Sequence, residues 1–355
     1  YTINILSLIS LVGVMVLALS GAALEAYMTL FVMLSLGYAI STRILMRRAG
    51  IHVSNAAIDD ALKTRMQQQY IWTALMFMIF ALSNKSVENL LLNTYVGPEA
   101  VGWFAIAAAM TRGGVDLLTS GLNTVLLPML SRALGARDTD HAYGILSDAM
   151  RIFFFLGVTL AGVGVLWSDP AITLLYGEQY APAVTGLRVM MLIGGLLMPE
   201  AATAALLTTT DRQMLRVTLA LSSLVITLIA AYALIPSFGF EGALASHAIA
   251  RVAIFVASTV IITRFFGIQL PFSSFMRTIA AAAIAAGLAM MVLTYSSGIT
   301  GQLVAGAIYG LACICSSVVF GVWTTHDVST LHHFTNRLPG LRPLERVLTR
   351  FARQI

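Results

Sequence analysis

Charged residues inside an otherwise apolar stretch are the first feature of this sequence that suggests chemistry. In residues 83–132, which are rich in Ala, Leu and Val, the charges include Lys85, Glu88, Arg112 and Asp116. A charge at the centre of a bilayer costs about 2.5–3.5 kcal/mol on insertion scales, so such side chains usually face a protein interior or a watery cavity. We therefore expect these four side chains to point away from lipid.

Four polar residues of this stretch have helical spacing. Arg112, Asp116, Thr119 and Asn123 stand at positions i, i+4, i+7 and i+11. At about 100° per residue, these positions share one narrow face of an α-helix. The stripe predicts the lining of a polar translocation path. The alternative is an Arg112–Asp116 pair that only locks two helices together.

Further candidates lie on later apolar segments. His247, Arg251 and Ser258 share a helix face, and Glu200 follows Pro199. A proline removes a backbone donor and frees a carbonyl, and such a break is often placed beside a cavity. For His247 the alternative is a packed core histidine.

The candidates form two groups with different predicted roles. The predicted substrate pathway consists of Lys85, Arg112, Thr119, Asn123, His247 and Arg251. The acids predicted for ion coupling or for charge pairing are Glu88, Asp116 and Glu200. We expect Lys85, Arg112, Glu200 and Arg251 to converge on one cavity, so the segments that carry them must pack together.

The composition predicts an all-α polytopic membrane protein. Of the 355 residues, 58% are hydrophobic and 10% are charged, whereas soluble domains carry about 25% charged residues. The net charge of +5 lies mainly in alternate short loops, as membrane orientation requires, so no nucleic-acid partner is expected. Cys313 and Cys315 point to different faces of one apolar segment, and no metal site is predicted.

Ten segments are long and apolar enough to span, since a spanning helix needs about 20 such residues. They are residues 3–21, 23–42, 70–94, 100–130, 146–167, 183–209, 217–235, 241–264, 277–295 and 302–323. Breaks are predicted at Gly97-Pro98, at residues 168–170 (Ser-Asp-Pro), and at Pro236 with Gly239. These breaks end the third, fifth and seventh segments.

The distribution of Lys and Arg predicts the orientation. The connections between successive predicted spans fall alternately on the two sides of the membrane. Lys and Arg occur in the connections of one side only, for example in residues 43–69 and in the tail. The Arg-rich side is cytoplasmic, so residues 168–182 are expected outside.

The predicted division of the chain has five parts. They are two last helices of an N-terminal lobe (1–42), a cytoplasmic linker (43–69), a six-helix C-terminal lobe (70–266), an additional helix pair (267–323) and a cytoplasmic amphipathic tail (324–355). Transporters often have two homologous halves, so two spans before the linker predict a truncated first lobe. The apolar face of residues 341–355 is expected on the inner leaflet, or else docked on the protein.

Catalytic motifs are missing from the sequence. It contains no CxxC, HExxH, GxSxG or phosphate-cradling GKS/T motif. We therefore expect a protein that is not an enzyme and that uses no cofactor.

Three passages resemble one family in the right order. VENLLLNTYVGPEAVGWFAIAAAM, followed by VLLPMLSRA, is similar to the start of the second lobe of bacterial polysaccharide-export flippases, which belong to the multidrug/oligosaccharidyl-lipid/polysaccharide superfamily. LLYGEQYAPAVTGLRVM resembles their outer-loop segment YG..Y..A, and ALIPSFGFEGALAS resembles their turn LIP.yG..GAa. The resemblance covers about residues 1–330. Many relatives place an aspartate where this chain has residues 85–88.

The resemblance implies a function. It implies fourteen helices in two lobes, of which four are missing here, in a multi-pass protein of the bacterial inner membrane. The implied substrate is an undecaprenyl-pyrophosphate-linked glycan such as a precursor of lipopolysaccharide O-antigen. The other implied partners are membrane lipids and polysaccharide-assembly proteins.

Three alternatives remain open. A multidrug antiporter of the same superfamily would need an acidic and aromatic site, whereas the embedded cations here are at least as numerous as the acids. A membrane polymerase or ligase would need a large outer loop, and the longest predicted one is residues 168–182. A passive scaffold would have no use for aligned charges.

Overall fold

The computed structural model describes residues 2–21, 23–48, 59–83, 86–210 and 212–323. The described elements are helices, which confirms the predicted all-α membrane architecture. The chain divides into two compact units, residues 1–66 and 67–355. Lys85 and the predicted amphipathic tail lie outside the described residues.

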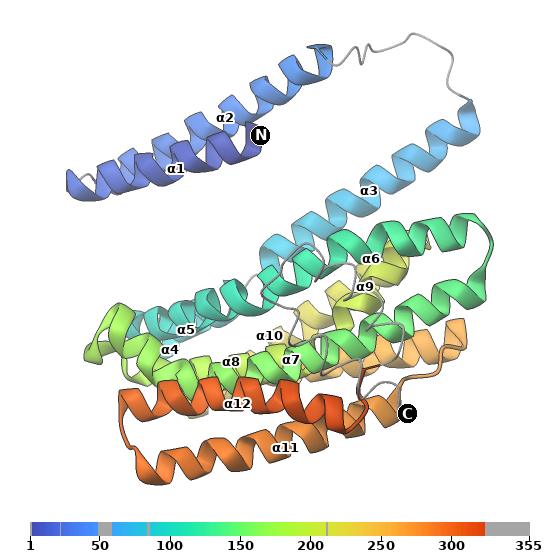
Figure 1. Cartoon of the computed structure of the whole chain (residues 1–355). Helices are drawn as coiled ribbons and strands as arrows, with labels where there is room; N and C mark the ends of the chain where they lie inside the picture. Colours follow the sequence, from blue (N-terminus) through green and yellow to red (C-terminus); the bar gives the residue numbers. More distant parts are fainter. Residues whose placement is uncertain (1, 22, 49–58, 84–85, 211, 324–355) are drawn as a thin grey trace. The chain divides into compact units, whose positions relative to one another are not determined.

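The first unit contains a pair of apolar helices, α1 (Thr2–Leu19) and α2 (Leu24–Arg48). Figure 1 shows the two helices running side by side. Gly13 of α1 allows close packing, because a Cβ there would come within 2.9 Å of the Leu30 side chain. The boundary between the units falls inside the next helix, α3 (Asp60–Ser83).

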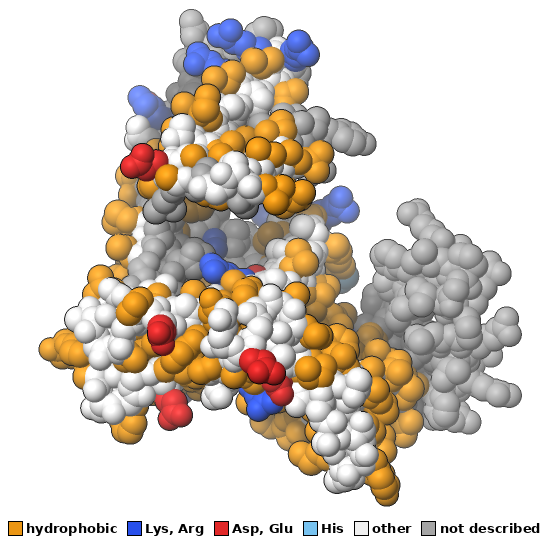
Figure 2. All heavy atoms as spheres, turned by 90° about the vertical axis from the view of Figure 1, so that its left-hand side faces the viewer, with side chains coloured by type: hydrophobic (Ala, Val, Ile, Leu, Met, Phe, Trp, Pro, Cys, Tyr) orange, Lys and Arg blue, Asp and Glu red, His pale blue; other side chains and the backbone are white. Residues whose placement is uncertain are grey.

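The second unit holds the remaining helices. After α3 these are α4 (Ser86–Tyr95), α5 (Pro98–Thr111), the π-helical segment η1 (Arg112–Asp116), α6 (Leu117–Gly135), α7 (Thr139–Tyr176), the 3-10 turn η2 (Glu178–Tyr180), α8 (Pro182–Leu196), α9 (Glu200–Thr209), α10 (Gln213–Phe266), α11 (Phe272–Tyr295) and α12 (Ile299–Val319). Within the described ranges, six helices are long and apolar enough to cross a membrane, or seven if the bent pair α8–α9 is one span. Figure 2 shows hydrophobic side chains spread over the visible face, with charged side chains confined to small patches.

Helix α10 is folded back on itself and supplies two of the predicted spans. Gly239 has a non-helical backbone, with φ 57° and ψ −127°, which glycine adopts without a steric penalty. A straight helix of these 54 residues would be about 80 Å long. Yet Arg212, just before α10, lies over the ring of Phe266 at its end, 5.2 Å from the ring centroid. The predicted break at Pro236 and Gly239 is therefore confirmed.

The predicted end of the fifth span at residues 168–170 is wrong, because α7 continues through Pro170 to Tyr176. Tertiary contacts keep this part helical despite the missing proline N–H. Pro170 is buried, and Asp169 accepts a hydrogen bond of 3.0 Å from Gln302 of α12. Asp169 thus joins two helices instead of ending one.

Helix α7 lies at the centre of the second unit and contacts α6, α8, α9, α11 and α12. Its contact with α8 is very close, since a Cβ on Gly157 would come within 2.1 Å of the Gly195 carbonyl oxygen. Its contact with α12 includes a hydrogen bond from the Tyr309 hydroxyl to the Val158 carbonyl, 3.2 Å long. These contacts fix the frame on which the candidate site is built.

Candidate functional site

A broken helix positions the first site residue. Helices α8 and α9 meet at an angle of 51°, with Pro199 immediately before α9. The predicted helix break at this proline is confirmed. Glu200 is the first residue of α9, where the positive end of the helix dipole favours a carboxylate.

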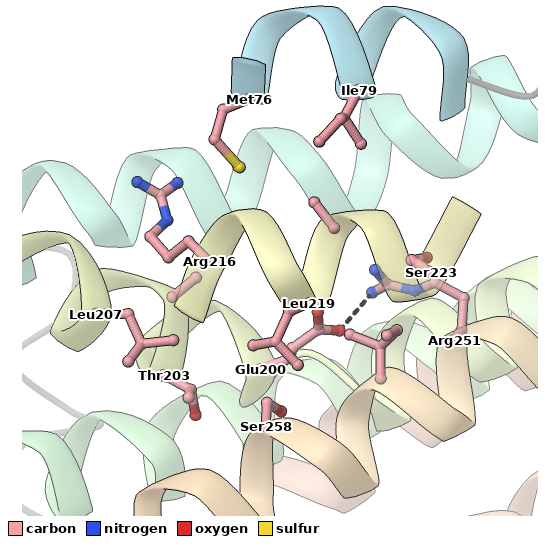
Figure 3. Close-up of a pocket in the computed structure, with 13 residues that line it drawn as sticks. Met76, Ile79, Glu200, Thr203, Leu207, Arg216, Leu219, Ser223, Arg251 and Ser258 are labelled. Atoms are coloured by element: carbon pink, nitrogen blue, oxygen red, sulfur yellow. Dashed lines mark ion pairs between the residues drawn. The ribbon is translucent and has the colours of Figure 1, made fainter. Parts of the chain in front are cut away.

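Beside this break lies a cavity of about 240 Å³, which we call the α9–α10 cavity. Its walls come from α3, α9 and both halves of α10 (Figure 3). Its polar lining residues are Glu200, Thr203, Arg216, Ser223, Arg251 and Ser258. The other lining residues are apolar and include Met76 and Ile79 of α3.

An ion pair occupies one side of this cavity. The guanidinium Nη2 of Arg251 lies 3.3 Å from the Glu200 carboxylate Oε2 (Figure 3). The Arg251 side chain is 37% exposed and the Glu200 side chain 21% exposed, whereas the Oε2 atom that contacts Arg251 is buried. The geometry of the contact is not that of a hydrogen bond, and Glu200 Oε2 has no hydrogen-bond partner.

A second arginine was missed by the sequence analysis as a site residue. Arg216 lies in the first turn of α10 and lines the same cavity, on the other side of the view in Figure 3. Its Nη1 approaches the Gln213 side-chain oxygen at 3.5 Å. The spacing of Arg216, Ala220 and Ser223 at i, i+4 and i+7 was the available signal, since it places all three on one helix face.

His247 belongs to a different polar pair. Its Nδ1 lies 3.7 Å from Oε1 of Glu88 on α4, whose side chain is only 2% exposed. The ring of His247 also packs edge-on against Phe104 of α5, with 6.4 Å between the centroids. The other Glu88 oxygen, Oε2, is buried and has no hydrogen-bond partner. His247 and Arg251 are one helical turn apart, yet they contact different acids.

The polar stripe does not have the α-helical register that its spacing predicted. Residues Arg112 to Asp116 form the π-helical segment η1, which adds residues to the turn and shifts the angles after it. The two consecutive glycines 113 and 114 weaken the α-helix here. Arg112 and Asp116 are exposed.

The later part of the stripe is half-buried. The Thr119 hydroxyl donates to the Val115 carbonyl at 2.6 Å, and Asn123 Oδ1 is buried without a hydrogen-bond partner. None of the four stripe residues is among the described residues that line the α9–α10 cavity. Of the residues expected to converge, Glu200 and Arg251 share this cavity, Arg112 does not line it, and Lys85 lies outside the described residues. The pathway role of the stripe stays a prediction.

The part of the chain that the structure describes contains no candidate metal site. No three His, Cys, Asp or Glu side chains gather there in a way that could hold an ion. The chemistry available in the cavity is therefore that of arginine, carboxylate and hydroxyl groups, which suits the binding of an anion.

Comparison with known proteins identifies the group to which the chain is similar. The family described as "Polysaccharide biosynthesis protein" matches residues 2–185. No curated protein matches the sequence. Among solved structures, the crystal structure of a MATE P26A mutant has a TM-score of 0.50 and 15% identity, and the match covers 74% of this chain and 66% of that one.

A MOP superfamily transporter from Pyrococcus furiosus gives a TM-score of 0.49 and 16% identity, with 74% of this chain and 65% of that one covered. The chain therefore spans slightly less than two thirds of the length of these structures. At such low identity, the MATE structure is informative about the fold alone. The likeness of the helical fold and the family match are independent observations.

Proposed function

We propose that this chain, which belongs to the polysaccharide biosynthesis protein family, is a flippase that moves a lipid-linked polysaccharide precursor across the membrane. The observation that carries the proposal is the α9–α10 cavity, whose lining includes Arg216, Arg251 and a single acid, Glu200. The described lining thus carries a net charge of +1 inside an apolar bundle.

The charge and shape of the cavity support an anionic headgroup as the substrate. A diphosphate that carries sugars cannot cross hydrocarbon unaided, because burying an unpaired charge is very costly. The planar guanidinium of arginine binds phosphate oxygens in pairs. Met76 and Ile79 add an apolar wall from α3, beside which a prenyl chain can lie. The undecaprenyl-pyrophosphate-linked glycan fits these requirements.

The place of the cavity along its helices supports loading from the cytoplasm. At 1.5 Å per residue, Arg216 lies about 5 Å from the start of α10, and Glu200 lies about 14 Å from the end of α9. The connection between these two ends is on the side predicted to be cytoplasmic, because Arg212 lies in it and Arg216 lies just after it. In a bacterium this is the side of the inner membrane on which the precursor is made, and alternating access would then carry it outward.

The multidrug-antiporter alternative is less well supported by this cavity. A site for organic cations should contain acids and aromatic rings, which attract positive charge. The described lining contains no aromatic residue, and its arginines outnumber its acid. Lys85, Arg112, Thr119 and Asn123 stay predicted parts of the wider pathway, and contacts with polysaccharide-assembly proteins stay predictions.

The proposal is tested by export of glycan in cells that lack the native gene. We expect Arg216→Gln and Arg251→Gln to lower surface glycan at least tenfold, with lipid-linked precursor accumulating inside, because the anion site is lost. Arg188→Gln is the matched control, since Arg188 is an exposed arginine of α8 that does not line the cavity. Membrane abundance is measured for every variant. Normal export by both cavity variants at normal abundance would disprove the role of the cavity.

A further inference from the structure

We propose that Glu200 is an internal substitute for the substrate's phosphate: its carboxylate occupies Arg251 in the empty cavity and is displaced when a phosphate group binds. This inference rests on the proposed function and assigns roles within the same site. The Glu200–Arg251 ion pair is then broken and formed again during transport, and it is not a permanent link between the two helices.

The geometry of the pair is that of a replaceable contact. Charge-assisted hydrogen bonds are usually about 2.7–2.9 Å long, whereas Arg251 Nη2 and Glu200 Oε2 are 3.3 Å apart and not aligned as a hydrogen bond. The arginine is 37% exposed. Its guanidinium therefore has donors that an incoming oxyanion can reach from the cavity.

The position of Glu200 explains how its carboxylate can remain charged when it loses the contact with Arg251. It begins α9 directly after the proline break, so the helix dipole favours its negative charge even without the arginine. The N–H groups of residues 200, 201 and 202 already donate to the carbonyls of residues 197, 198 and 199. The carboxylate is consequently held by the field of the helix and by Arg251, and its Oε2 has no hydrogen-bond partner.

The rest of the cavity can take the remaining charge of the ligand. Arg216 lies on the other side of the lining, and Thr203 of α9 and Ser223 and Ser258 of α10 also line the cavity. The Ser258 hydroxyl donates to the Phe255 carbonyl at 2.9 Å. A diphosphate carries at least two negative charges, which exceeds what Arg251 alone neutralises. Displacement of Glu200 leaves Arg251 and Arg216 both available to the ligand.

The exchange has a consequence for transport. A transport site must bind its substrate firmly enough to load it but loosely enough to release it. Because Glu200 competes with the phosphate for Arg251, it weakens binding of the substrate. The Glu200–Arg251 ion pair forms again when the substrate leaves. Removal of this competitor should tighten binding and slow release.

The test measures binding of farnesyl diphosphate and of inorganic pyrophosphate to the purified protein by calorimetry, in micelles of a neutral detergent. We expect Glu200→Gln to lower the Kd for both probes at least tenfold, because Gln keeps the shape but no longer competes as an anion. Arg251→Gln should raise the Kd at least tenfold, and the double variant should behave like Arg251→Gln. Glu178→Gln removes an exposed acid of η2, away from the cavity, and should leave the Kd unchanged.

Several outcomes would overturn the proposal. They are an unchanged or higher Kd in Glu200→Gln, an equal gain in Glu178→Gln, or no binding of either probe to any variant. Loss of the Glu200 effect when phosphatidylglycerol is added would show that a phospholipid headgroup, and not the substrate, takes Arg251. Export is measured separately: failed export with the expected binding pattern contradicts the flippase, whereas normal export without that pattern contradicts only the exchange by Glu200.

Discussion

Glu88 and His247 show how a polar pair is kept inside an apolar cluster. The pair lies next to Leu92 and Phe104, which are among the most buried residues of the second unit. Glu88 is 2% exposed, and His247 Nδ1 is 3.7 Å from its Oε1. A buried carboxylate that loses its partner leaves its desolvation uncompensated. We infer that the pair connects α4 to the second half of α10.

The first prediction concerns this pair. His247→Phe should lower the free energy of unfolding by about 1–3 kcal/mol, because Phe keeps a ring beside Phe104 but leaves Glu88 without its imidazole. Adding Glu88→Met should recover most of the loss, since the buried polar group is then removed as well. Equilibrium unfolding in mixed micelles measures both variants.

The control for this prediction is His141→Phe, since His141 is exposed near the start of α7. It should change stability by less than about 0.5 kcal/mol. Equal losses in the single and double variants at the buried pair would contradict the inferred contact between α4 and α10.

At the scale of elements, two glycines set how closely α7 and α8 approach. A Cβ on Gly195 would come within 2.3 Å of the Gly157 carbonyl oxygen, and a Cβ on Gly157 within 2.1 Å of the Gly195 oxygen. In both cases the obstacle is backbone, which cannot turn aside as a side chain can. Gly195 lies in the last turn of α8, just before the break that positions Glu200. The close contact therefore fixes the helix end next to the cavity.

The second prediction follows from this contact. Gly195→Ala should lower the free energy of unfolding by about 1–3 kcal/mol or more, since overpacking forces the two helices apart. Gly102→Ala in α5 is the matched control, because a Cβ there meets nothing within 4 Å. The control should be neutral or stabilising by about 0.5–1 kcal/mol, because alanine favours the helix more than glycine does. An equal response of both variants in thermal unfolding would show that the close contact is absent.

At the scale of the whole molecule, the spans and the loops between them determine the orientation. Gly97-Pro98 ends one span as predicted, since Gly97 has a φ of 130° and Pro98 begins α5. Lys63, in the first turn of α3, and Glu178, in η2, are both exposed. The arginine distribution predicts that these two residues lie on opposite sides of the membrane.

The third prediction is this topology. In intact cells, Glu178→Cys should react with a membrane-impermeant maleimide, and Lys63→Cys should react only after the membrane is opened. Both are made in a background in which Cys313 and Cys315 are replaced by Ser. Labelling of Lys63→Cys from outside would reverse the orientation and would place the α9–α10 cavity toward the outer leaflet.

Sequence alone determined the features that depend on local composition and on backbone chemistry. The spans follow from runs of apolar residues, which must be helical in lipid because no water satisfies the backbone there. The breaks at Gly97-Pro98, Pro199 and Gly239 follow from glycine and proline geometry. The different environments of Cys313, which is buried, and Cys315, which is exposed, follow from helical spacing.

Only the tertiary structure decided which charges meet. His247 and Arg251 share a face by spacing, but His247 contacts Glu88 and Arg251 contacts Glu200, because the acids come from different helices. Pro170 stays helical because its neighbours bury it, and Arg216 joins the cavity because α10 folds back at Gly239. Such pairings depend on contacts between residues far apart in sequence, and the spacing within one helix carries no information about its neighbours.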